Sequence, residues 1–373
     1  MNVQETLADL VAIDSVSSRS NSRIIEYLQQ RCERAGFAVK RFSYNDGSEK
    51  FNLLASIGDD HSYAELALVG HTDTVPYDPN WIEATTLTEK DGKLFGRGAC
   101  DTKGFIAAAL TAIENVDLNR LKRPLALIFT ADEEIGLLGA KYLAELNPIR
   151  LRYSIVGEPT SLQPIRAGKG YALAEVIVRG REAHSAYPAL GSSAVFRAAR
   201  LVSRLEGIAQ QVQSETHDGF DPPFTTLNVG VINGGTAKNV IAGECRFTLE
   251  WRPIPTQNPT LVLDLLHAAI EEEKKSDPDF DCEIDFSRRD SGFETSSESL
   301  LVTFLEDTAK KKAGSVAFGT EGAQMARLGS EAVVLGPGDI RHAHRTGEFV
   351  PIDELNRCVE ILMKAINHFC SRE

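Results

Sequence analysis

Closely spaced cysteines are missing from this sequence. Its 373 residues include six cysteines, and no two of them lie within four residues of one another. The C-x-x-C spacing of many zinc sites and redox centres is therefore absent. So few cysteines in so long a chain do not make a disulfide framework. We expect reduced cysteines and a reducing compartment.

Long apolar runs and an excess of positive charge are also missing. The longest largely apolar stretch, residues 105–113, is far shorter than the roughly 20 residues that span a bilayer. Lys and Arg number 40 against 53 Asp and Glu, a net charge of −13, which disfavours binding to nucleic acid or to an anionic membrane surface. Acidic residues interrupt the apolar ones in residues 1–16, unlike in a signal peptide. We expect a cytoplasmic protein without nucleic-acid or membrane partners.

Several enzyme signatures are absent as well. The sequence contains neither the G-x-S-x-G elbow of serine hydrolases nor the H-E-x-x-H motif of zinc proteases. The pair Gly96 and Gly98 lacks the third glycine of a dinucleotide-binding loop. We interpret this pair as a bend that directs Asp101.

Short apolar runs alternate with helical patterns in the two outer parts of the chain. A representative helical pattern covers residues 104–116. The alternation predicts an α/β domain with a largely parallel sheet, because strands covered on both faces are apolar throughout. The runs that predict buried strands are 52–57, 66–69, 125–129, 154–156 and 332–335.

The middle of the chain has a different pattern, which predicts a ferredoxin-like α+β unit. Its elements follow the order β-α-β-β-α-β. We therefore predict an α/β domain over residues 1–172 and 288–373, interrupted by an inserted domain over residues 173–287. The predicted elements of the insertion are the strand 171–178, the helix 194–212, the strands 226–232 and 240–251, the helix 261–272 and the strand 282–286.

Chemically reactive side chains follow four of the predicted strands. In open α/β sheets, ligands bind beyond the carboxyl ends of the strands. We therefore expect these side chains to meet at one edge of the sheet. In chain order they are His71 and Asp73, the triplet 132–134, Glu158, and finally His342 and His344, with Asp101 after the glycine bend.

Such a collection of carboxylates and imidazoles needs positive charge to balance it. Histidine and carboxylate ligands without thiolates suit Zn²⁺, Co²⁺ or Mn²⁺. Two histidines, two terminal carboxylates and one bridging carboxylate would give each of two metal ions three protein ligands, the composition of a hydrolytic centre. We therefore expect two divalent metal ions.

Each feature also has an ordinary explanation when taken alone. An acidic triplet such as 132–134 is usually a solvated turn, and a His-x-Asp after a strand is more often part of a loop. Only the convergence of several such features favours a metal site. We interpret Cys100 as a small buried residue, and we interpret four further histidines as structural, namely His61, His217, His267 and His368.

These motifs, in this order and spacing, resemble the M20 family of dinuclear metallohydrolases. The resemblance covers nearly the whole chain, and it implies a zinc-peptidase-like α/β catalytic domain. It also implies that the inserted domain acts as a lid and joins two chains in a homodimer. The matching segments are Gly70–Pro76, Gly96–Gly104, Ala131–Glu134, Gly157–Thr160, Gly180–Ser185, 228–230 with Asn239, Arg252–Pro253, 336–338 and Ala343–His344.

The resemblance implies a set of metal ligands. Asp101 bridges the two ions, His71 and Glu158 complete one site, and Glu134 and His344 complete the other. Zn²⁺ is the expected metal, with Co²⁺ as the alternative. His342 competes with His344 for one position, and the segment 348–350 that follows favours His344.

The resemblance also implies roles beyond metal binding. Asp73 holds the second ring nitrogen of His71, and Glu133 carries a proton from water to the leaving amine. On the inserted domain, His184 stabilises the oxyanion, and Asn239 and Arg252 hold the substrate α-carboxylate.

The implied reaction is metal-dependent hydrolysis of the N-acyl amide of a small amino acid. Within the family the chain resembles the members that act on N2-acetyl-L-ornithine, because of segments 51–55, 87–94, 158–164 and 320–321. Thr102 and residues 322–324 depart from the pattern of relatives. N-succinyl-diaminopimelate, acetylcitrulline and dipeptides are alternative substrates. A non-catalytic amino-acid or metal binder is a further alternative, but it would not need Glu133.

Overall fold

A computed structural model describes residues 2–44 and 49–371. These residues form two compact units. Unit 1 contains residues up to 166, 294–314 and from 320 onward, and unit 2 contains residues 167–293 and 315–319. Unit 2 is thus longer at both ends than the predicted segment 173–287. The division at 172 and 288, and the role of the insertion as a lid, stay predictions.

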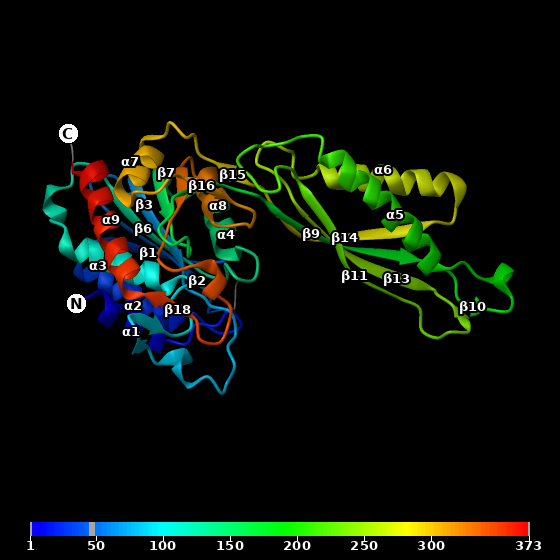
Figure 1. The fold of residues 1–373 in the computed structure, drawn as a ribbon, viewed down its shortest axis with the longest axis horizontal. Coiled ribbons are helices and arrows are strands. Elements are labelled where there is room, and N and C mark those ends of the chain that lie inside the picture. Colours follow the sequence, from blue (N-terminus) through cyan, green and yellow to red (C-terminus); the bar gives the residue numbers. More distant parts are fainter. Residues whose placement is uncertain (1, 45–48, 372–373) are drawn as a thin grey trace. The chain divides into compact units, whose positions relative to one another are not determined.

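The main sheet forms the centre of unit 1 (Figure 1). Its strands, in spatial order, are β1 (Ala38–Ser43), β2 (Phe51–Ile57), β6 (Leu125–Thr130), β3 (Tyr63–His71), β7 (Arg150–Val156), β17 (Glu331–Val334), β8 (Ile165–Gly168) and β15 (Phe293–Glu294), with β16 (Gly314–Val316) beside β8. The central strands β6, β3, β7 and β17 are parallel. On the flanks, β1 and β2 pair in antiparallel fashion, as do β17 and β8. The predicted largely parallel α/β fold is confirmed.

Helices cover both faces of this sheet. One face shares an apolar core with α1 (Val3–Ala12), α2 (Ser22–Arg34), α3 (Lys103–Asn115), α7 (Leu300–Ala309) and α9 (Ile352–Cys370). Leu66 and Leu68 of β3 belong to this core. Residues that alternate with them along the strands point to the other face, where α4 (Leu138–Leu146) and α8 (Gly322–Arg327) pack against β2, β7 and β17.

The amino-acid pattern explains the two most buried elements. All six residues of β6 are buried, as expected for a strand covered on both faces. In α3, every residue from Lys103 to Ile113 is buried, and most of them are apolar, as expected for a helix covered on all sides. The five apolar runs of the sequence therefore predicted strands that the structure contains, namely β2, β3, β6, β7 and β17.

A small second sheet connects two distant loops of unit 1. It consists of β18 (Phe349–Pro351), β5 (Lys93–Phe95) and β4 (Thr88–Lys90). Phe349 pairs with Phe95, so the end of the loop that precedes β18 lies beside the start of the loop that follows β5.

Short 3-10 helices lie at Ile82–Thr85, Leu118–Arg120, Pro188–Leu190 and Ile340–His342.

Unit 2 has the predicted β-α-β-β-α-β order of elements. They are β9 (Tyr171–Arg179), α5 (Ala194–Val212), β11 (Thr226–Gly234), β13 (Glu244–Arg252), α6 (Leu261–Ser276) and β14 (Asp281–Asp290). The strands form an antiparallel sheet in the order β11-β13-β9-β14, with β11 at one edge. One apolar core joins this sheet to α5 and α6.

The prediction of one continuous strand over residues 240–251 was wrong. Val240 and Ile241 form β12 (Val240–Ile241), which pairs with β10 (Ala183–His184) in a separate small sheet. Strand β13 starts only at Glu244, and Gly243 accepts a hydrogen bond from the backbone of Gly180. The competing pairing with β10 therefore breaks the apolar run, an effect that periodicity does not reveal.

The longest helices have a polar side. Helices α5 and α9 each contain 19 residues and bury only part of them. Within residues 2–44 and 49–371, no helix combines the length and the apolar character needed to cross a membrane.

Candidate metal centre

Six chemically reactive side chains of unit 1 meet beyond the carboxyl ends of the central strands. His71 is the last residue of β3, Glu133 and Glu134 follow β6, and Glu158 follows β7. Asp101 comes from the loop between β5 and α3, and His344 comes from the loop between β17 and β18. The strand-end rule thus identified side chains that the structure brings together.

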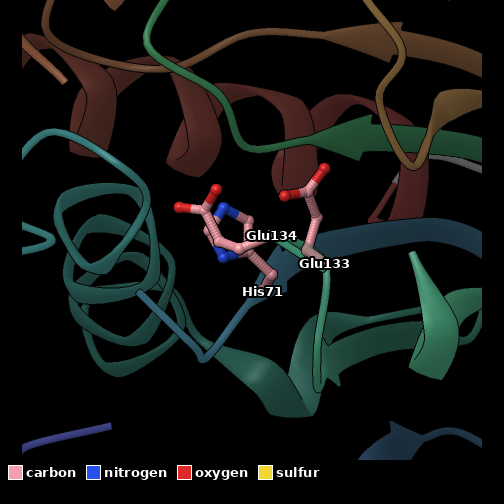
Figure 2. Close-up of side chains that lie close together, drawn as sticks. All are labelled: His71, Glu133 and Glu134. Atoms are coloured by element: carbon pink, nitrogen blue, oxygen red, sulfur yellow. The ribbon is translucent and has the colours of Figure 1, made fainter. Parts of the chain in front are cut away.

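The donor atoms form three overlapping groups, each with all its donor atoms within 4.8 Å of one another. Figure 2 shows one group, in which the carboxylates of Glu133 and Glu134 flank the imidazole of His71. The other groups are His71 with Asp101 and Glu158, and Asp101 with Glu134 and His344.

The Asp101 carboxylate lies between the two imidazoles. Its Oδ1 is 3.0 Å from Nε2 of His71, and its Oδ2 is 3.0 Å from Nε2 of His344. The same nitrogen of His344 lies 3.0 Å from Oε2 of Glu134. Asp101 is therefore shared between two sets of ligands, the geometry that a bridging carboxylate requires.

The Asp73 side chain fixes the acidic loop after β6. Its Oδ1 accepts a hydrogen bond from the backbone N–H of Glu133 at 3.0 Å, and its Oδ2 accepts one from Glu134 at 3.3 Å. The Ser17 hydroxyl donates to Oδ2 at 2.7 Å. Nδ1 of His71 lies closer to the backbone oxygen of Asp73, at 3.0 Å, than to its carboxylate, at 3.6 Å. Asp73 therefore orients His71 through its backbone and the two glutamates through its side chain.

Residues before and within β2 also hold this loop. Asp132 has a left-handed backbone, with φ of 54°, and its carboxylate accepts from Lys50 Nζ at 2.5 Å and from the Tyr44 hydroxyl. Asn52 accepts the backbone N–H of Ala131 at 3.0 Å. No pattern in the sequence assigns a role to Tyr44 or Lys50, whereas Asn52 lies in a segment that supported the family resemblance.

Three carboxyl groups of the cluster, those of Glu133, Glu134 and Glu158, hold protons unusually tightly. Burial raises the pKa of Glu133, and Glu134 and Asp101 raise it further. Burial raises the pKa of Glu158 as well, with added repulsion from Asp101 and Glu133. For Glu134, burial again raises the pKa, although its hydrogen bond with His344 opposes the effect.

The imidazoles hold protons tightly too. Hydrogen bonds with Asp101 and Glu134 raise the pKa of His344 to about 10. Burial opposes protonation of His71, but Asp101 and Asp73 raise its pKa well above the ordinary value. Asp101 differs: burial opposes its ionisation, but its hydrogen bonds with His344 and His71 hold its pKa well below the ordinary value. A buried, ionised carboxylate surrounded by further carboxyl groups attracts positive charge. The oxygen and nitrogen donors of the cluster, without thiolate, fit a pair of divalent ions.

Two neighbours of the cluster, His342 and Cys100, lie outside the groups of donor atoms. The ring of His342 stacks on Phe349, with centroids 4.4 Å apart, whereas His344 contacts Asp101, so the structure favours His344 as the ligand. Cys100 is buried, and its Sγ lies 3.5 Å from the backbone oxygen of Asp339.

Glu321 is a further buried carboxyl whose charge is felt by Glu133. Glu321 is fully buried, and its carboxylate accepts a hydrogen bond from the Thr130 hydroxyl at 2.5 Å. Burial raises the pKa of Glu321 to about 7. Only its place in a segment resembling relatives marked this residue in the sequence.

Three predicted site residues belong to unit 2. His184 ends β10 and is exposed, and the backbone N–H of Ser185 donates to the backbone oxygen of Asn239, so His184 and Asn239 are close neighbours. Arg252 ends β13, where its guanidinium stacks on Tyr171 at 3.8 Å from the ring centroid. Their action on the substrate stays a prediction.

Comparisons with known proteins place the chain in a family. Residues 67–368 match the family described as Peptidase family M20/M25/M40. The acetylornithine deacetylase of Myxococcus xanthus is 54% identical over 372 residues, which cover 99% of this chain and 97% of the relative. The acetylornithine deacetylase of Yersinia pestis is 34% identical over 368 residues, or 97% of this chain and 94% of the relative.

Solved structures share the fold. A tripeptidase from Staphylococcus aureus has a TM-score of 0.79 at 22% identity, over 99% of this chain and 98% of that one. A metallo-carboxypeptidase from Sulfolobus solfataricus has a TM-score of 0.77 at 20% identity, over 98% of both chains. At these identities the comparison shows the fold alone.

Proposed function

This chain belongs to peptidase family M20/M25/M40 and is a metal-dependent amidohydrolase, and we propose that it converts N2-acetyl-L-ornithine and water to L-ornithine and acetate. The choice of this substrate rests on the 54% identity, over 99% of the chain, to the acetylornithine deacetylase of Myxococcus xanthus. The ligand cluster of unit 1 supports the reaction class.

We propose that the site holds two divalent ions, Zn²⁺ or alternatively Co²⁺. His71, Asp101 and Glu158 would hold one ion, and Asp101, Glu134 and His344 the other. When bound, the ions would supply Lewis-acid chemistry that polarises the amide carbonyl and activates water.

The chain's own residues would do the rest. Glu133 sits beside His71, held through its backbone N–H by Asp73, and its raised pKa suits a group that takes a proton from water and gives it to the leaving amine. His184 would donate to the oxyanion that forms at the carbonyl, and Asn239 and Arg252 would hold the α-carboxylate.

A substrate panel tests the proposed reaction. Purified protein loaded with Zn²⁺ or Co²⁺ is assayed with N2-acetyl-L-ornithine, N-succinyl-diaminopimelate, acetylcitrulline and a dipeptide. We expect the largest kcat/KM for N2-acetyl-L-ornithine, and metal-free protein serves as the control. A larger kcat/KM for another member of the panel would contradict the proposal and identify that member as the better substrate.

Replacing His184 by Ala should lower kcat by about 10²- to 10³-fold, because one oxyanion donor is lost. KM should change less, since the interaction strengthens in the transition state. His267, exposed on α6 of the same unit, provides the control variant His267→Ala, which should keep its activity. Steady-state kinetics with metal content measured on the same preparation decides the matter; an unchanged kcat would remove His184 from the mechanism.

We further propose that two copies of the chain pair through unit 2. The edge strand β11 exposes Val231 and Ile232, and Phe196 on α5 is 72% exposed. Apolar side chains beside an unpaired strand edge are suited to pairing with a second copy.

The distance between the predicted substrate residues supports this pairing. His184 and Asn239 lie near the Glu244 end of β13, because β10 pairs with β12 just before this strand. Arg252 lies at the other end, eight residues along, which is roughly 26 Å at the usual rise of a strand. A single copy of unit 2 therefore does not bring both His184 and Arg252 to one small substrate. A second copy of the chain can contribute the residue that is missing.

Mixing two inactive variants tests this arrangement. Chains with Glu133→Gln lack the base but keep His184, and chains with His184→Ala lack the donor but keep Glu133. After subunit exchange, a mixed dimer has one complete site, so an equal mixture should recover about a quarter of wild-type activity. Light scattering should give twice the 40.8 kDa mass of one chain. A monomer, or a mixture without recovery, would contradict shared sites.

A further inference from the structure

Glu348 connects the two loops that carry Asp101 and His344. The side chain is 1% exposed, and it follows His344 by four residues in the loop before β18. Its Oε1 accepts hydrogen bonds from the backbone N–H groups of Cys100 and Asp101, both at 3.0 Å. One carboxylate oxygen thus fixes the backbone of the shared ligand from a loop 247 residues away in sequence.

The other oxygen of Glu348 is held in place by Arg97. Nη1 of Arg97 donates to Oε2 at 2.6 Å, and both side chains are buried. Arg97 is in turn anchored, because its Nη2 donates to the backbone oxygen of Pro76 at 3.3 Å. The backbone of Gly96 also donates to the backbone oxygen of Glu348 at 3.1 Å. The two loops are therefore joined by both side-chain and backbone bonds.

The loop that carries His344 needs such support. His344 has a left-handed backbone with φ of 56°, a conformation that residues other than glycine rarely adopt. Glu348 lies at the far end of this loop, where β18 pairs with β5. Fixing Glu348 therefore fixes the point from which the loop reaches back to the cluster.

We propose that Glu348 is a positioning residue that sets the separation of Asp101 and His344 and thereby the affinity for one of the two metal ions. The proposal rests on the metal centre described under the proposed function. The ion held by Asp101, Glu134 and His344 takes two of its three ligands from the loops that Glu348 joins. The ion held by His71, Asp101 and Glu158 takes only one, so it should depend less on Glu348.

The variant Glu348→Gln tests the proposal, because it keeps the size of the side chain but removes the charge opposite Arg97. Apoprotein is titrated with Zn²⁺ in a calorimeter, and the two dissociation constants are fitted separately. We expect the weaker-bound ion of the variant to bind about 10- to 100-fold less tightly than in the wild type. The tighter constant should stay within a few-fold.

Glu65 provides the matched control. It is also a buried glutamate of unit 1, and it accepts hydrogen bonds from Arg123 and Arg152 at 3.2 and 3.1 Å. Glu65→Gln should lower the thermal unfolding temperature of the apoprotein without changing either metal affinity. This contrast separates positioning from general stability. Should Glu348→Gln fail to fold, Glu348→Asp, whose shorter side chain does not reach both backbone groups, takes its place with the same expectation.

The outcomes are distinct. Two unchanged affinities in a folded Glu348 variant would overturn the positioning role while leaving the metal centre intact. Wild-type protein that binds no metal would instead overturn the metal centre, and the role of Glu348 with it. Weaker binding of one ion alone in Glu348→Gln, without such a change in Glu65→Gln, supports the proposal.

Discussion

Replacing Glu133 by Gln is expected to lower kcat by about 10²- to 10⁴-fold while the protein still binds two metal ions. Glutamine keeps the shape of the side chain but does not accept a proton from water. The backbone bond from Glu133 to Asp73 is unaffected by the change, so the loop should keep its position. Kinetics on N2-acetyl-L-ornithine, with metal analysis of the same sample, measures both effects.

The main alternative is that Glu133 binds a metal ion, because its carboxylate oxygen lies close to donor atoms of His71 and Glu134. The adjacent Glu134 provides the control. Glu134→Gln should lose metal as well as activity, since Glu134 contacts His344 directly. If Glu133→Gln loses metal to the same degree, Glu133 is a ligand and not the base. If its kcat stays within a few-fold of the wild type, Glu133 is neither.

Replacing Asp101 by Ala is expected to have the largest effect of all, because both sets of ligands share this carboxylate. Two cations only a few ångströms apart repel one another, and the bridging carboxylate offsets that repulsion. Without it, we expect fewer than one tightly held ion per chain and activity no higher than that of metal-free protein. Metal analysis after dialysis measures the occupancy.

Cys100→Ala is the matched control for this variant. Cys100 is the buried neighbour of Asp101 in the same loop, and its backbone N–H binds Glu348 in the same way. Losing its side chain should cost stability but leave two ions bound. An Asp101→Ala protein that keeps two ions and yet is inactive would show that Asp101 acts in some other way.

Local sequence patterns predicted those parts of the fold in which burial is continuous. Strand β6 and helix α3 are buried almost throughout, so their residues are apolar and their boundaries are visible in the sequence. The ligand cluster was predictable for a related reason: parallel strands direct their carboxyl ends to one edge, and His71 and Glu158 follow such strands directly.

Interactions between distant segments left no such pattern. The strand predicted over 240–251 is divided because Val240 and Ile241 pair with β10 instead. Asn21 lies at the N-terminus of α2, yet its side chain bonds the backbone of Phe51 and does not cap the helix. Glu348 appeared in the sequence only as a marker beside His344. A hydrogen bond across 247 residues has no periodicity, and it becomes visible only when the loops are placed in space.

The position of β17 has a consequence for how the protein is made. This strand lies between β7 and β8 in the sheet, although β7 ends at Val156, β8 begins at Ile165 and β17 begins only at Glu331. A ribosome therefore synthesises all of unit 2 before it makes the strand that fills this gap. His344 and Glu348 emerge later still. A nascent chain can begin to fold earlier, but it can assemble the complete metal centre only after residues 344–348 have left the ribosome. Until then, the exposed edges of β7 and β8 are the places where a chaperone would be needed.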